Sequence, residues 1–150
     1  MFDIVKFAPK EREYEGIELL EAGKLPQNII ASTPDVVKAR GLVRKVKYLH
    51  FENYDFEQGL LKIMKERNCI LAICLSDFFS LNGMQMVGRM RKAANLARAA
   101  QKSGVRVRIF TYAKDETQLR DEYEIYFIGK LLGIGEPMLK AAKEEKMREI

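Results

Sequence analysis

Short apolar runs recur along the chain and predict five β-strands. The strongest run covers residues 70–75 and is apolar throughout, which is typical of a central parallel strand that is buried on both faces. The other runs are shorter or alternate with polar residues, and Pro, Gly, Asn or charged residues bound them. They cover residues 2–7, 28–31, 46–51 and 105–110.

Apolar residues at three- and four-residue spacing predict helices between and after these strands. The first covers residues 11–22, with Gly23 as its C-terminal stop. The second begins after Ser32-Thr33-Pro34, where a hydroxyl can cap the helix just ahead of a first-turn proline. The remaining helices are expected over residues 55–68, 84–102, 115–132 and 136–149.

This alternation of strands and helices predicts the α/β class, with a parallel sheet and right-handed crossovers. No internal repeat or linker interrupts the pattern, so residues 1–150 are expected to form one domain. Five strands are too few for the usual eight-stranded barrel, which takes about 250 residues. The sheet is therefore expected to be open, or to form a TIM-like partial barrel.

Composition narrows the class of protein. The chain has 150 residues, of which 47% are hydrophobic and 31% charged, as in globular domains. No apolar run approaches the roughly 18 residues of a membrane helix, and the N-terminus lacks a signal segment, so we expect a cytoplasmic protein without a membrane partner.

Cys69 and Cys74 are expected on opposite faces of one strand and should be free, buried thiols. With one histidine and two cysteines, no metal site of the usual ligand count and spacing is expected. No glycine-rich phosphate loop lies between a strand and a helix, so no cofactor is expected.

The charge distribution points to an anionic partner. Net charge is +5, and residues 78–114 contain no Asp or Glu. In the helix expected at 84–102, one face carries Met86, Met90, Ala93, Ala97 and Ala100. The opposite face carries Arg91, Asn95, Arg98 and Lys102.

This row of positive charge favours binding to the phosphate backbone of a nucleic acid, because each phosphate that it neutralises releases condensed counterions. The alternative is an ordinary solvated helix face, although such faces usually intersperse acids and bases. Arg106 and Arg108 alternate with apolar residues on the next strand. That strand is therefore expected either to lie near a sheet edge protected by charge or to line a groove that a partner occupies.

A second possible site follows from the parallel sheet, because ligands bind beyond the carboxyl ends of parallel strands. An enzyme would recruit Glu52 and Asp77 there as paired carboxylates, with His50 or Lys114 as a proton carrier. The structural alternative is that Asp77 starts a turn and His50 packs inside its strand. Other residues expected at these strand ends are Ser32, Thr33, Asn53, Ser76 and residues 112–115.

The order of motifs from about Phe56 to Ile150 resembles a known family. Leu75-Ser76-Asp77-Phe78-Phe79, followed by a long basic helix containing Arg89–Ala97, is similar to protein component 3 of archaeal ribonuclease P, whose eukaryotic relative is a nuclear ribonuclease P subunit. The strand at 105–112 follows, then Gly129-Lys130-Leu131-Leu132-Gly133-Ile134 and a final helix that begins at Glu136-Pro137.

The resemblance implies a non-catalytic subunit with a barrel-like fold. In that family the RNA subunit removes the 5′ leader of precursor tRNA, and component 3 pairs with protein component 2 and helps to fold or activate the RNA. Expected partners are ribonuclease P RNA, component 2 and, indirectly, precursor tRNA. Residues expected to contact RNA or a protein partner are Arg89, Arg91, Lys92, Arg98, Lys102, Arg106, Arg108 and Lys114.

Two departures separate this chain from the family pattern. Asp77-Phe78 stands where the family has Arg-Pro, and Thr111-Tyr112 replaces a serine-containing strand end. The chain is also shorter than is usual for the family, so we expect its early strands to be lost or compressed. Two other functions stay open: a small α/β enzyme with a site at the carboxyl ends of the strands, and a protein-interaction subunit whose basic strip meets an acidic partner.

Overall fold

A computed structural model describes residues 1–146 of the chain. Within these residues the strands are β1 (Phe2–Val5), β2 (Glu13–Tyr14), β3 (Ile17–Glu21), β4 (Ile30–Thr33), β5 (Tyr48–Phe51), β6 (Ile70–Cys74) and β7 (Val107–Phe110). The α-helices are α1 (Val36–Leu42), α2 (Gln58–Glu66), α3 (Ser76–Phe79), α4 (Gly83–Lys102), α5 (Glu122–Leu131) and α6 (Glu136–Glu144). Two short 3-10 helices, η1 (Ala22–Lys24) and η2 (Glu116–Gln118), complete the regular structure.

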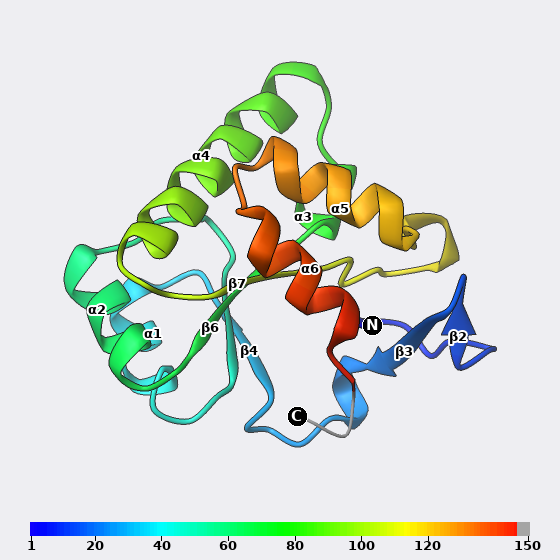
Figure 1. Cartoon of the computed structure of the whole chain (residues 1–150), viewed down its shortest axis with the longest axis horizontal. Helices are drawn as coiled ribbons and strands as arrows, with labels where there is room; N and C mark the ends of the chain where they lie inside the picture. Colours follow the sequence, from blue (N-terminus) through cyan, green and yellow to red (C-terminus); the bar gives the residue numbers. More distant parts are fainter. Residues whose placement is uncertain (147–150) are drawn as a thin grey trace.

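The centre of the molecule is a four-stranded sheet with the order β4-β5-β6-β7 (Figure 1). All three neighbouring pairs are parallel. Helix α1 connects β4 to β5, α2 connects β5 to β6, and α3 and α4 connect β6 to β7. The predicted α/β class, with a parallel sheet that alternates with helices, is therefore confirmed.

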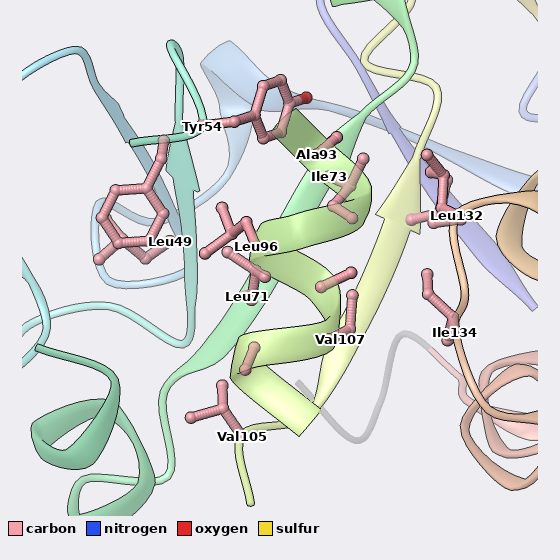
Figure 2. Close-up of a cluster of buried hydrophobic side chains, with 14 of the residues drawn as sticks. Leu49, Tyr54, Leu71, Ile73, Ala93, Leu96, Val105, Val107, Leu132 and Ile134 are labelled. Carbon is pink, nitrogen blue, oxygen red and sulfur yellow. The ribbon is translucent and has the colours of Figure 1, made fainter. Parts of the chain in front are cut away.

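The two faces of this sheet are covered differently. On one face, Leu71, Ile73 and Val107 share a buried cluster with Leu96 and three alanines of α4 (Figure 2). On the other face, the side chains of β6 and β7 share a second buried cluster with Phe2, Ile4 and Leu20. Strand β6 is thus buried on both faces, as predicted, but strands rather than helices cover the second face.

The covering strands include a segment for which the predicted helix was wrong. Residues 11–22 hold the two-stranded hairpin of β2 and β3, in which Tyr14 pairs with Ile17. The two loop residues, Glu15 and Gly16, have φ angles of 47° and 78°. Positive φ at both loop positions is the geometry of the tight turns that join twisted antiparallel strands. The apolar residues of β3 also fit a helical spacing, and in the strand they are buried.

Several predicted boundaries shift. Strand β4 begins two residues later than expected, and the carboxylate of Asp35, rather than a hydroxyl, caps α1 by accepting from the backbone N–H of Val37 at 2.8 Å. The helix expected at 115–132 is divided into η2 and α5 because Asp121 forms a capping box with Glu124. The last predicted helix is found as α6, and residues 147–149 of that prediction lie outside the described residues.

Strand β1 is fixed to the segment that follows β7. The backbone N–H of Tyr112 donates to the carbonyl of Ile4 at 2.9 Å, and that of Lys6 donates to the carbonyl of Ala113 at 2.7 Å. Between them, the buried carboxylate of Asp3 accepts hydrogen bonds from the backbone N–H of Thr111, at 2.8 Å, and from its hydroxyl. Burial raises the pKa of Asp3 from 3.8 to about 6, although the Thr111 hydrogen bonds oppose this shift.

This shift predicts a pH-dependent contribution to stability. Because the pKa of Asp3 is higher in the folded state, its contribution is fully present below about pH 3.8 and is lost as the pH rises through about 6. Asp3→Asn should remove that dependence. The free energy of unfolding of the natural chain should therefore fall, relative to the variant, by up to about 3 kcal/mol between pH 4 and pH 7.5. Urea unfolding at both pH values measures this, and parallel pH profiles for the two proteins would contradict it.

Candidate functional site

Helix α4 presents the predicted basic face. Ala93, Ala97 and Ala100 are fully buried, and Met86 and Met90 pack against the same core. The residues expected on the opposite face are all exposed: Arg91, Asn95, Arg98 and Lys102. The sequence periodicity therefore placed both faces of this helix correctly.

Three charges on this helix lack an acidic partner. Arg91, Arg98 and Lys102, called the basic row below, have no carboxylate within 4.0 Å among residues 1–146. Their neighbours on the helix are engaged: Lys92 pairs with Asp55 at 2.9 Å, and Arg89 donates to the backbone carbonyl of Glu52 at 3.1 Å. The basic row thus keeps its positive charge facing solvent.

The remaining predicted basic residues lie apart from this row. Lys114 is exposed after β7. Arg106 is exposed too, and it borders a groove of about 890 Å³ between the sheet and α6. Strand β7, which carries Arg108 and follows Arg106, is the edge strand of the four-stranded sheet. This agrees with the interpretation that these two arginines lie near a sheet edge.

The prediction that Arg108 contacts RNA or a protein partner was wrong, because its side chain is buried and only 4% exposed. Its Nε donates to Glu145 Oε2 at 3.0 Å, and its terminal nitrogen donates to the carbonyl of Phe2 at 2.9 Å. The guanidinium lies 5.2 Å from the ring centre of Phe2 and 5.0 Å from that of Phe110. Its charge is neutralised inside the chain and does not contribute to the exposed basic surface.

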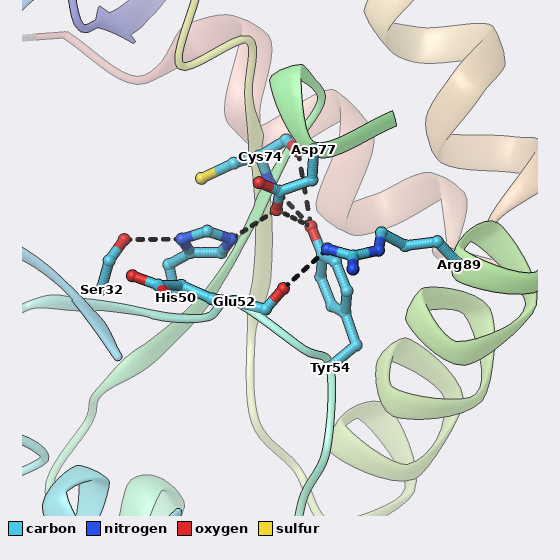
Figure 3. A network of polar contacts seen from close by, with 7 residues as sticks. All are labelled: Ser32, His50, Glu52, Tyr54, Cys74, Asp77 and Arg89. Atoms are coloured by element: carbon cyan, nitrogen blue, oxygen red, sulfur yellow. Dashed lines mark hydrogen bonds and ion pairs between the residues drawn. The ribbon is translucent and has the colours of Figure 1, made fainter. Parts of the chain in front are cut away.

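A polar network lies at the carboxyl ends of the parallel strands (Figure 3). His50 is at its centre and is only 2% exposed. Its Nδ1 lies 2.6 Å from the hydroxyl of Ser32, and its Nε2 lies 2.6 Å from Oδ2 of Asp77. Tyr54 donates its hydroxyl to the same carboxylate oxygen at 2.6 Å. These four residues are called the His50 network.

The strand register explains how this network forms. Ser32 of β4 and His50 of β5 are register partners in adjacent parallel strands, so both side chains lie on the same sheet face. Asp77 stands at the start of α3, immediately beyond the end of β6. The network therefore collects one residue from each of three successive strand ends, and Tyr54 reaches it from the loop after β5.

Two tyrosines at this edge have unusual backbone geometry. Tyr54 and Tyr112 have φ angles of 55° and 49°, a left-handed conformation that is rare for bulky residues. Their rings lie 5.9 Å and 6.0 Å from the imidazole of His50, centre to centre. Burial is the main cause that raises the pKa of both phenols, so both hydroxyls stay protonated at neutral pH.

The structure brings together only part of the set that the sequence suggested for an enzyme. His50 and Asp77 meet, but the contact recorded for Glu52 is made by its backbone carbonyl. Lys114 donates its backbone N–H to Gln118 at 2.9 Å and is exposed. Thr33 accepts from the backbone of Asp35 at 3.1 Å. Tyr54 was not among the predicted site residues, because no local pattern around a loop residue signals a contact with a residue 23 positions away.

Metal ligands, thiols and membrane helices were also sought in residues 1–146. No group of three His, Cys, Asp or Glu side chains is arranged there to hold a metal ion. Cys69 and Cys74 are free and buried, as predicted, and they belong to the clusters on opposite faces of the sheet. No helix of the described chain has the length and apolar character needed to cross a membrane.

The internal role of Arg108 can be tested by removing its partner's charge. Glu145→Gln keeps the shape of the side chain but leaves Arg108 buried without a carboxylate, so it should lower the free energy of unfolding by about 3 kcal/mol. Arg108→Met combined with Glu145→Gln should recover most of that loss, because neither member of the pair is then charged. Urea unfolding of both variants measures the difference. Stability of Glu145→Gln equal to that of the natural chain would show that the pair does not matter.

Comparison with known proteins found no relative that indicates a function for this chain. No model of a protein family matches it, and no curated protein matches it either. Its function is therefore inferred from the basic row, the His50 network and the order of the elements that carry them.

Proposed function

We propose that this chain is an RNA-binding protein subunit of a ribonucleoprotein and does not itself cleave the RNA substrate. The observation that carries the proposal is the basic row of Arg91, Arg98 and Lys102, which is exposed and lacks acidic partners in the described chain. A row from residue 91 to residue 102 extends about 16 Å along the helix. That length suits contacts with several successive backbone phosphates.

The rigidity of the supporting helix favours binding further. Helix α4 has 20 residues, and four residues of its inner face are completely buried against the sheet. The backbone under the basic row is therefore already ordered before a partner arrives. Only the side chains lose freedom on binding, which keeps the entropic cost of association low.

The ribonucleoprotein that we propose is ribonuclease P, in which RNA removes the 5′ leader of precursor tRNA. The support is the resemblance to component 3, whose motifs fall on β6, α3, α4, β7, α5 and α6 in the same order. The proposal includes a TIM-like partial barrel formed by β4–β7 with β1, cytoplasmic location, and ribonuclease P RNA and component 2 as partners. Asp77, which stands where the family has arginine, serves the His50 network here.

A separate surface is available for a protein partner such as component 2. On α5, Tyr123, Phe127 and Leu131 follow one another at four-residue spacing and are 71%, 62% and 75% exposed. Large apolar side chains in such a stripe are typical of a helix face that packs against another protein. The proposal therefore assigns RNA to α4 and the protein partner to α5.

The RNA role of α4 is tested by the salt dependence of binding. Replacing Arg91, Arg98 and Lys102 together by Ala should weaken binding to ribonuclease P RNA and lower the slope of log K against log salt concentration by about one unit for each lost phosphate contact. Filter binding across a salt series measures the slope. The matched control replaces Arg44, Lys62 and Arg67, which are also two arginines and a lysine, exposed and without acidic partners in the described chain.

The control variant should bind with the slope of the natural chain. Equal slopes for both triple variants would overturn the assignment of RNA to the basic row, provided that circular dichroism shows both to be folded. Reconstituted cleavage of precursor tRNA tests the choice of ribonucleoprotein. Adding the chain to ribonuclease P RNA and its other proteins should raise the rate or lower the magnesium requirement, and no effect would overturn that choice.

A further inference from the structure

We propose that Ser32, His50 and Asp77 form a nucleophilic site that hydrolyses small carboxylic esters, an activity beyond the proposed RNA-binding function. Ser32 is the nucleophile, His50 is its general base, and Asp77 is a positioning residue that acts through His50. The proposal starts from two hydrogen-bond distances of 2.6 Å, one on each ring nitrogen of the same buried histidine.

The carboxylate decides which nitrogen of His50 carries the proton. A carboxylate oxygen accepts hydrogen bonds, so the imidazole tautomer that fits Oδ2 of Asp77 carries its proton on Nε2 and donates it there. Nδ1 is then left with a lone pair that faces the hydroxyl of Ser32. This is the relation between nucleophile, base and orienting acid that activates serine hydroxyls, with the two ring nitrogens exchanged relative to the serine proteases.

The surroundings hold this arrangement in place. The hydroxyl of Tyr54 binds the same oxygen of Asp77 at 2.6 Å, and the left-handed backbone at Tyr54 and Tyr112 places both rings against His50. Strained backbone at two bulky residues persists only where the surroundings require it, and it concentrates at functional sites. Tyr112 also shares a hydrogen bond with Ser32, which ties the nucleophile to the same cluster of rings.

Part of the site reaches solvent. Ser32 and Asp77 are half-buried, whereas His50 and Tyr54 are buried. The hydroxyl of Ser32 lies on the strand-covered face of the sheet, together with its register partner His50. Because β4 is the edge strand of the sheet, a small substrate would reach Ser32 from that edge.

The reaction balances without a metal or a further reactant. Ser32 Oγ attacks the carbonyl carbon of the ester, and its proton passes to Nδ1 of His50. When the bond to the alcohol oxygen breaks, that proton moves to the leaving alcohol and an acyl-serine remains. Water then attacks the acyl carbon, gives a proton to Nδ1, and the acid leaves as this proton returns to Ser32. The net change is one ester and one water to one acid and one alcohol.

A fluorophosphonate probe tests the nucleophile directly. Ser32 Oγ should attack its phosphorus, fluoride should leave, and intact-mass and peptide mass spectrometry of the full chain should find a single adduct on Ser32. Ser32→Ala should abolish the adduct, whereas the control Ser80→Ala, at an exposed serine outside the network, should label like the natural chain. Hydrolysis of 4-nitrophenyl acetate should follow the same order among the three proteins.

Variants of Asp77 and Tyr54 distinguish activation of Ser32 from a purely structural role of the His50 network. Asp77→Asn should slow labelling at least tenfold, because the amide no longer fixes the proton on Nε2. Tyr54→Phe removes the other hydrogen bond to the same oxygen and leaves His50 in contact with Asp77, so it should change the labelling rate far less. Equal slowing by both variants would show that the network only packs this edge of the sheet.

Two results would overturn the proposal outright. One is the absence of an adduct on Ser32 in the folded natural chain at millimolar probe. The other is labelling at the same rate after unfolding in urea, since an unactivated serine is indifferent to the fold. Binding to ribonuclease P RNA by Ser32→Ala should equal that of the natural chain, so failure of one proposal is distinguishable from failure of the other.

Discussion

The parallel pairing of β4, β5, β6 and β7 is the constraint on which the rest of the molecule depends. Because neighbouring strands run in the same direction, every strand must be followed by a segment that returns across one face, and α1, α2 and α4 fill that layer. The same pairing brings the carboxyl ends of three strands to one edge. The basic surface of α4 and the His50 network are therefore two products of one backbone arrangement, on opposite sides of the sheet.

Polar groups on the strand-covered side of the sheet distinguish it from the helix-covered side. Asp3, His50 and Arg108 are all nearly or completely buried there, and each is satisfied by a partner from a distant part of the sequence: Thr111, Asp77 and Glu145. Burying such groups is expensive unless their hydrogen bonds are complete. This side thus admits few alternative packings, whereas the helix-covered side is held by apolar contacts that tolerate repacking more readily.

Elements with a strong local pattern were predictable from the sequence. The continuous apolar run of β6 and the two-faced periodicity of α4 each contain enough consistent positions to decide their structure and burial. The hairpin of β2 and β3 was not predictable in this way, since Ile17 and Leu20 fit both a helical and an extended spacing. The discriminating signal was the Glu15-Gly16 pair, whose positive φ angles are typical of a tight hairpin. Burial of Arg108 depends on Glu145, 37 residues away, and no local pattern records such a pairing.

The hydrogen bond between Asp3 and Thr111 joins residues 108 positions apart, which has a consequence for how the chain acquires its structure. Strand β1 emerges first from the ribosome, yet the segment that anchors it is made near the end of synthesis, about ten seconds later at about 10 residues per second. Until then Phe2 and Ile4 lack Phe110 and Tyr112, which belong to the same buried cluster. Such high contact order slows folding.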